Sequence, residues 1–296
     1  MYDHESTVRS RYVGQELARA AQKTGRGVCD MADLLGWSPS KVSRLLHGKR
    51  GVNTEDLSAY LALCGVTGDR RKELLELARD AYGATWWQDH GTRPPVCNQA
   101  LDDNEAVAER ITCFGGTAVP DLMQIPDYTR ALLTTQPSIP EDEIDERITA
   151  RMRRQTILRR GFGTPDLSVF VTEYALTRTG VGDATMSEQA HHLLGLAAHP
   201  TITIRLLPED DTVSDIAPFS LLEFVDQQPA VYLEHATYTA FLQRPETIAA
   251  YNNIITTLDR LALNEADSRS QITVIAQRRS VQPIPLAEQH AIWVSG

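Results

Sequence analysis

The chain has 296 residues, of which 42% are hydrophobic and 23% are charged, a composition that excludes a disordered chain and allows one large domain or two smaller ones. No run of residues approaches the roughly 18 uncharged apolar positions of a membrane helix, and the first residues lack the apolar core of a secretory signal. The four cysteines form no C-x-x-C pair, which argues against structural zinc and is typical of free thiols. We therefore expect a cytoplasmic protein with no membrane contact, no metal and no cofactor.

The net charge of −10 argues against nucleic acid as a partner, but the charge is unevenly distributed. Residues 1–100 hold fourteen Lys and Arg against twelve Asp and Glu, whereas the remaining residues hold fifteen against 27. Within residues 9–50 the balance is nine basic to three acidic residues. The first part of the chain thus keeps the positive charge that a nucleic-acid surface requires, and the second part carries the acidic excess.

Apolar residues at helical spacing predict five short helices in an all-α domain over residues 1–82. We expect them at 8–24, 28–35, 38–48, 54–64 and 69–81. Gly36 is suited to end the second helix in a left-handed conformation, and Ser38 is suited to cap the third, with Pro39 in its first turn. The Gly- and Pro-containing residues 83–100 are expected to form a linker.

The second part mixes helical and strand-like patterns and predicts an α+β domain over residues 101–277. We expect helices at 105–114, 141–160, 187–198 and 245–263, and strands at 167–172, 201–207, 219–224 and 230–234. The order of the strands is not readable from the sequence. Residues 278–296 are expected to form an irregular tail.

Residues 28–50 carry the clearest motif. Two amphipathic helices meet at Gly36-Trp37-Ser38, where the small Ala32 allows close approach and Val42 and Leu45 face the core. This pattern resembles the helix-turn-helix of phage-repressor-like (XRE-family) regulators, through Ala32-x-x-x-Gly36-x-Ser38, Val42-Ser43-Arg44 and Gly48-Lys49-Arg50. Leu46 departs from the glutamate common in that family. The alternative interpretation is a plain helical bundle with a basic face.

The resemblance implies that the helix starting at Ser38 enters the major groove of double-stranded DNA. Ser40, Lys41 and Arg44 are then candidates for contacts with base edges or nearby phosphates, and the amides beside Ser38 are suited to a phosphate. Lys49 and Arg50 would contact phosphates and set the register. The complete set of DNA-binding candidates is Ser38, Ser40, Lys41, Ser43, Arg44, Lys49 and Arg50.

Residues from about 85 to 275 resemble the domain of unknown function DUF5753, which follows such a helix-turn-helix in antitoxin-like regulators of actinobacteria. The resemblance depends on the order of several blocks, which include Trp86-Trp87, Val119-Pro120-x-Leu122-x-Gln124-x-Pro126-x-Tyr128, Arg151 to Gln155, Glu173-x-x-Leu176-x-Arg178, Met186-x-x-Gln189, Pro218-Phe219-x-Leu221-Leu222 and Val231 to Glu234. In the second block, Asp121 stands where the family usually has glycine. If that turn required a positive φ, aspartate would tolerate it less well.

The resemblance implies a regulator whose second domain senses a protein or small-molecule signal. The acidic excess suits a small basic partner protein, as in an antitoxin-like module, although it also fits a surface that merely keeps the protein in solution. A small-molecule site or an enzyme, with a vestigial helix-turn-helix, is the other alternative, but no hydrolase, metalloprotease or phosphate-loop motif is present and we predict no catalytic residue. Candidates for a ligand or partner site are Asp121, Gln124, Tyr128, Glu173, Arg178, His191 and Glu234.

Overall, the sequence predicts a DNA-binding transcriptional regulator. Most proteins with this kind of reading helix bind two-fold operators as dimers, so we also expect a homodimer.

Overall fold

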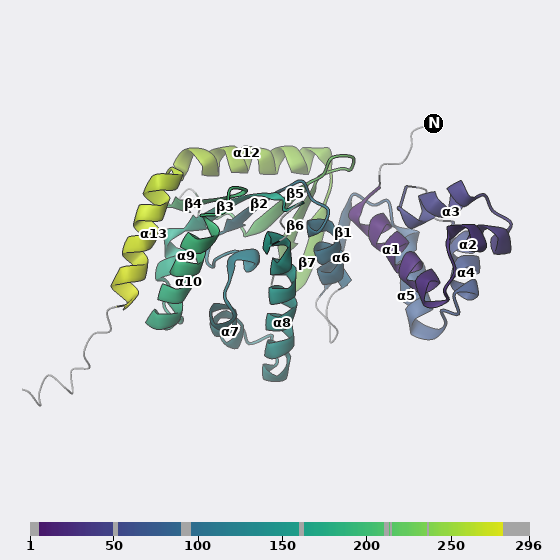
Figure 1. The fold of residues 1–296 in the computed structure, drawn as a ribbon, viewed down its shortest axis with the longest axis horizontal. Helices are drawn as coiled ribbons and strands as arrows, with labels where there is room; N and C mark the ends of the chain where they lie inside the picture. The colour runs from purple at the N-terminus through teal and green to yellow at the C-terminus, as the bar shows by residue number, and fades with distance from the viewer. Residues whose placement is uncertain are drawn as a thin grey trace, which may run out of the picture. The chain divides into compact units, whose positions relative to one another are not determined.

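A computed structural model describes residues 6–49, 53–89, 96–159, 163–209, 213, 215–235 and 237–280. The chain divides into two compact units. Unit 1 comprises the described residues up to Ile111 together with Phe219–Ile254, and unit 2 comprises those of Thr112–Pro218 and those from Ile255 onward. Figure 1 labels the helices and strands and colours the chain by residue number.

The helices of the N-terminal region are α1 (Val8–Lys23), α2 (Val28–Leu35), α3 (Pro39–Leu46), α4 (Thr54–Leu63) and α5 (Gly68–Arg79). The later helices are α6 (Val96–Glu105), α7 (Pro126–Thr134), α8 (Ile144–Arg154), α9 (Glu173–Thr177), α10 (Asp183–Leu196), α12 (Pro245–Leu261) and α13 (Glu265–Ser280). The 3₁₀ helices within the described residues are η1 (Asp121–Met123), η2 (Glu141–Glu143) and η3 (Gln155–Arg159).

Seven strands form one mixed sheet in the order β1-β7-β6-β5-β2-β3-β4. They are β1 (Thr85–Asp89), β2 (Arg110–Gly115), β3 (Asp166–Thr172), β4 (Ile202–Leu207), β5 (Phe219–Glu223), β6 (Ala230–Glu234) and β7 (Tyr238–Leu242). The β3–β4 pair is parallel, and β5, β6, β7 and β1 pair antiparallel in succession. An all-α region followed by helices mixed with a sheet confirms the predicted fold class.

The five N-terminal helices form where capping and apolar spacing predict them. Gly36 ends α2 at φ 64°, ψ 33°, and the Ser38 side chain accepts a hydrogen bond from the Lys41 amide at the start of α3. Their apolar faces share a core of buried side chains: Val13, Leu17, Ala21, Met31, Ala32, Val42, Leu45, Leu57, Tyr60, Leu61, Leu74 and Ala78. This packing, more than helix propensity, stabilises such short helices.

Residues 83–100, which the sequence favours as a linker, contain β1 and the start of α6. Strand β1 pairs with β7 from Thr85↔Leu242 to Asp89↔Tyr238. Trp86 is buried and its ring lies 5.7 Å from that of Tyr12 on α1 and 6.0 Å from that of Phe241 on β7. Pairing with a strand 150 positions later in the chain gives this segment its structure, and no local signal encodes it.

The expected helix at 105–114 is wrong. Helix α6 ends at Glu105, and residues Arg110–Gly115 form the strand β2, of which all but the first residue are buried. A short run that is apolar on both faces has no period that separates a strand from a buried helix, and here the sheet determines the outcome. Helix α13 also extends to Ser280 within the expected tail, whose remaining residues lie outside the described ranges.

In unit 2, α10 and α13 lie side by side, α13 also contacts β4, and α7 packs against α8 (Figure 1). Across the described ranges, no helix combines the length and the apolar character that crossing a bilayer requires.

Candidate nucleic-acid interface and the polar cluster of unit 2

Helix α3 lies tightly against α1 because two glycines permit a close backbone approach. A Cβ on Gly14 would lie 2.3 Å from the Leu46 carbonyl oxygen, and a Cβ on Gly48 would lie 2.6 Å from the Ser10 backbone. Gly48 also adopts φ +64°, and its carbonyl accepts a hydrogen bond of 3.0 Å from the Ser10 hydroxyl. These contacts fix the C-terminal end of α3 on the helical core.

Three exposed side chains follow one line along α3. Ser40, Arg44 and His47, which we call the outer stripe, are spaced four and three residues apart, opposite the buried Val42 and Leu45. The Arg44 Nε donates to the Ser40 carbonyl at 3.3 Å, and the His47 Nδ1 lies 2.7 Å from the Ser43 carbonyl. His47 is absent from the sequence-based candidates, although its helical spacing from Ser40 could have identified it.

Lys41 lies beside the outer stripe and is already paired. Its Nζ lies 2.9 Å from the carboxylate of Asp56 in the first turn of α4, and 3.8 Å from the centre of the Trp37 ring. The lysine and aspartate side chains are 22% and 24% exposed. Lys41 therefore joins α3, α4 and the turn between α2 and α3.

The remaining candidates for DNA contact lie at the two ends of α3 and along its flank. Ser38 caps the N-terminus of α3, and Ser43 is half-buried on its flank. Lys49 is exposed just after the helix, and Arg50 lies outside the described residues.

Helix α1 is also bound to α6 within unit 1. The buried guanidinium of Arg11 donates to the Asn104 side-chain oxygen at 3.1 and 2.5 Å, and it lies 4.9 Å from the centre of the Phe224 ring. Burial lowers the pKa of Arg11 to about 10. Closer to the end of α1, Arg19 binds the Asp103 carboxylate at 2.8 Å. The helical region and α6 thus share buried polar contacts.

In unit 2, a set of polar side chains surrounds η1, and its members bind either one another or the main chain of this segment. We call Asp121, Gln124, Thr129, Arg151, Arg154, Gln155 and Gln189 the η1 cluster. Gln124, 1% exposed, donates to the Val119 carbonyl at 2.7 Å. Its side-chain oxygen accepts from Thr129 at 2.8 Å and from Arg151 at 3.0 Å. These bonds satisfy both ends of the amide.

Two further glutamines of the η1 cluster bind main-chain groups. Gln155 donates to the carbonyls of Asp121 and Gln124 at 3.2 and 2.6 Å. Gln189 accepts from the Ile125 amide at 2.8 Å and donates to the Met123 carbonyl at 2.7 Å. Side chains of η3 and α10 thereby replace the backbone partners that a 3₁₀ turn lacks.

Asp121 forms ion pairs with two arginines of α8. Its Oδ2 lies 3.1 Å from Arg151 Nε and 3.6 Å from Arg154 Nη1, and the arginine side chains are 15% and 11% exposed. Among the described residues, every residue with a positive φ is a glycine, so Asp121 does not have a positive φ. The turn at Asp121 therefore does not require a glycine. Asp121 therefore adds an ion pair and no backbone strain at this turn.

Tyr128 is fully buried and completes the anchoring of this segment. Its hydroxyl accepts from the Val119 amide at 3.1 Å and donates to the Ala175 carbonyl at 3.0 Å. Burial raises the pKa of Tyr128, and the hydrogen bond from Val119 acts in the opposite direction. Three candidates for a ligand site are thus brought together: Gln124 bonds to Asp121, and Gln124 and Tyr128 both bond to the main chain of Val119.

The other ligand-site candidates do not gather at one place. Glu173 begins α9 and lies 3.4 Å from the Gln271 amide, whereas Arg178 ends that helix and donates to the Thr117 carbonyl at 2.8 Å. His191 is exposed on α10, with Nδ1 2.8 Å from the Ser187 carbonyl. Glu234 lies on β6 in unit 1. Within the described ranges, no three His, Cys, Asp or Glu side chains are grouped as metal ligands.

Two family models match the chain. A helix-turn-helix domain model matches residues 13–74, which comprise most of α1 and continue into α5. The model described as "Domain of unknown function (DUF5753)" matches residues 99–274, from α6 into α13. No curated protein and no solved structure matches the chain significantly. Because the second match covers more than half of the 296 residues, the chain belongs to the DUF5753 family, and it carries a helix-turn-helix domain ahead of that region.

Proposed function

We propose that this protein is a transcriptional regulator that reads an operator in double-stranded DNA with α3, and that it binds as a homodimer on a two-fold site. The observation that carries the proposal is the outer stripe: an arginine, a histidine and a serine stand exposed on a helix whose other side is fixed by Gly14 and Gly48. A rigidly placed helix holds its side chains in the register that base reading requires.

Charge supports the same function. Residues 9–50 carry nine basic and three acidic residues, although the chain as a whole has a net charge of −10. Since phosphate contacts supply much of DNA affinity, a locally basic segment matters more than the average charge. Arg44 is suited to pair with guanine O6 and N7 through two hydrogen bonds, whereas Lys49 is suited to a phosphate.

We assign signal reception to the DUF5753 region, with a small basic protein or a small molecule as the signal. The support is charge: beyond position 100 the chain has 27 acidic and fifteen basic residues. The negative field of such a region would steer a basic partner towards it. An enzymatic site gains no support from Asp121, Gln124 and Tyr128, because these side chains are bound internally.

The test selects bound sequences from random DNA with the full chain and then measures fluorescence anisotropy. Arg44→Ala is expected to weaken binding to the selected site about 10- to 100-fold and to relax the preference at one base pair. Arg79→Ala removes the same charge from the exposed end of α5 and serves as the matched control. Equal affinities for the wild type and Arg44→Ala would refute the assignment of α3.

A further inference from the structure

The outer stripe and Lys41 lie side by side on α3 but differ in what holds them. The Arg44 side chain is exposed, and among the described residues it bonds only to its own helix, at the Ser40 carbonyl. Lys41 is held from two sides, by the Asp56 carboxylate and by the Trp37 ring. A phosphate would have to displace both partners before it could gain the lysine charge.

Resting on the proposed function, we propose that Lys41 is a positioning residue and that Asp56 withholds its charge from DNA phosphates. Base reading then falls to the outer stripe. The Lys41–Asp56 pair fixes α3 against α4, and the aspartate lowers affinity for DNA of any sequence by engaging the one lysine within α3. Specificity is a difference of affinities, so suppression of non-specific binding sharpens it.

The position of Asp56 supports this role. Asp56 lies in the first turn of α4, where a carboxylate is stabilised by the helix dipole and is already favourably placed. The pair is about three-quarters buried, so salt screens it less than it screens an exposed pair. The contact with Trp37 holds the ammonium of Lys41 over a ring that belongs to the turn between α2 and α3.

The experiment measures the affinity of the full chain for a DNA duplex of unrelated sequence as a function of salt concentration. Asp56→Asn frees Lys41 without changing shape, and it is expected to steepen the slope of log K against log salt by about 0.9, the value for one added phosphate contact. Non-specific affinity at 50 mM salt is expected to rise roughly tenfold. Glu55→Gln, the exposed neighbour in the same helical turn, removes an equal charge and is the matched control.

Variants of Lys41 complete a double-mutant cycle. Lys41→Met removes the ammonium but keeps an unbranched side chain, and it is expected to leave the salt slope of the wild type unchanged while lowering the melting temperature. Combined with Asp56→Asn, it is expected to return the slope to the wild-type value. Lys41→Arg retains a cation for Asp56 and Trp37 and is expected to restore the melting temperature.

Two outcomes would overturn the proposal. A slope that becomes shallower by about 0.9 in Lys41→Met alone, with Asp56→Asn equal to Glu55→Gln, would show that Lys41 contacts a phosphate directly. Absence of DNA binding by the wild type at 50 mM salt would instead refute the proposed function, and this inference with it. The two failures are therefore distinguishable.

Discussion

The two regions that the sequence marks most strongly, α3 in unit 1 and the segment around η1 in unit 2, use their polar side chains in opposite ways. The outer stripe of α3 is exposed, and apart from bonds to its own helix its polar groups are directed to solvent. In the η1 cluster, Gln124 is buried and hydrogen-bonded at both ends of its amide. A family motif can thus record a requirement for folding as readily as one for recognition.

The difference follows from what each backbone needs. Helix α3 pairs its interior main-chain groups itself and has its first turn capped by Ser38, so its outward side chains remain available to a partner. The 3₁₀ turn η1 and its flanking residues leave amides and carbonyls that a helix would have paired, and side chains from η3 and α10 supply the missing bonds. The ligand-site hypothesis for Asp121, Gln124 and Tyr128 therefore competes with a structural role that the same atoms already fill.

The largest expected effect concerns the placement of α3. Gly14→Ala brings a methyl group within 2.3 Å of the Leu46 carbonyl, so α1 and α3 must separate. We expect a loss of about 3 kcal/mol in the free energy of unfolding, together with weaker DNA binding. Urea denaturation followed by circular dichroism measures the free energy of unfolding, and fluorescence anisotropy measures the binding of DNA.

The control for this prediction is Gly195→Ala in α10, where a Cβ would meet no atom within 4 Å. There the exchange is expected to stabilise the helix by up to about 1 kcal/mol. Equal effects of the two exchanges would contradict the close approach of α1 and α3.

The next effect tests the η1 cluster. Asp121→Asn leaves Arg151 and Arg154 without their shared carboxylate, and we expect a cost of about 2 kcal/mol in unfolding free energy. Asp145→Asn changes the total charge equally, but it breaks an exposed pair with Arg130 and should cost less than about 0.5 kcal/mol. If Asp121→Asn instead preserved stability and abolished the response to a signal, the ligand-site hypothesis would be favoured.

Two fully buried tyrosines, Tyr60 in unit 1 and Tyr128 in unit 2, allow a finer comparison. Tyr128→Phe removes hydrogen bonds to Val119 and Ala175 and is expected to cost about 1 kcal/mol. The Tyr60 hydroxyl has no hydrogen-bond partner among the described residues, so Tyr60→Phe is expected to be neutral within about 0.5 kcal/mol at pH 7. Thermal denaturation of both variants checks the difference, and a reversed order would contradict the hydrogen bonding of both sites.

The stability change of Tyr60→Phe, the smallest at neutral pH, is expected to become measurable at alkaline pH. Burial, with a smaller contribution from Cys64, raises the pKa of Tyr60 to about 12, whereas an unfolded tyrosine titrates near pH 10. The stability linked to protonated Tyr60 is therefore complete below about pH 10 and is lost as the pH rises toward 12. Tyr60→Phe should flatten this part of the pH profile of the urea midpoint, and identical profiles would place the hydroxyl in water.

The helical region was readable from the sequence because its signals are local. Gly36, Ser38 and the spacing of Val42 and Leu45 act within a few residues of one another. Strand β1 was not readable, since it depends on a partner 150 positions away. Gln124 could be marked as important, but its bonds reach Arg151 on another helix, and no pattern in the sequence indicates that the amide faces inward.

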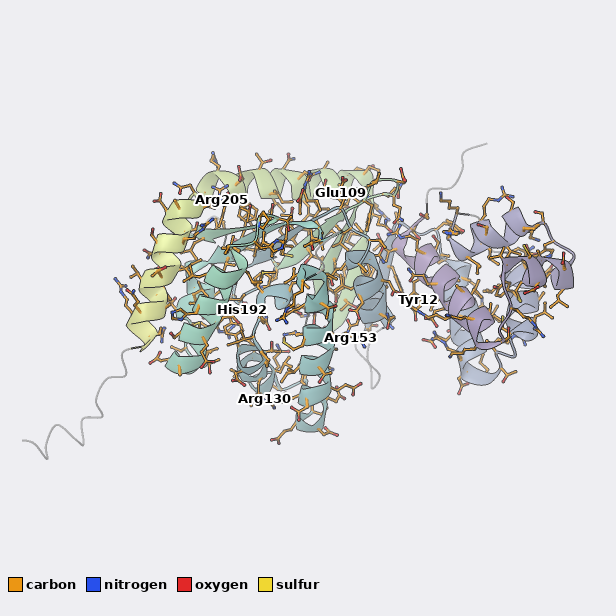
Figure 2. All side chains as sticks on the ribbon, viewed as in Figure 1. Tyr12, Glu109, Arg130, Arg153, His192 and Arg205 are labelled. Carbon is orange, nitrogen blue, oxygen red and sulfur yellow. The ribbon has the colours of Figure 1, made fainter. Side chains whose placement is uncertain are left out.

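The buried contact of Arg11 with Asn104 and Phe224 limits where the chain can be divided into fragments. Figure 2 shows Tyr12 on the same helix, and its ring packs against Trp86 of β1. A fragment cut after residue 82 would bare a guanidinium and an aromatic ring that are covered in the intact chain. The helix-turn-helix region therefore cannot be exchanged at the boundary between the two family matches without losing these contacts, and chimaeras should carry α1, β1, α6 and β7 from the same parent.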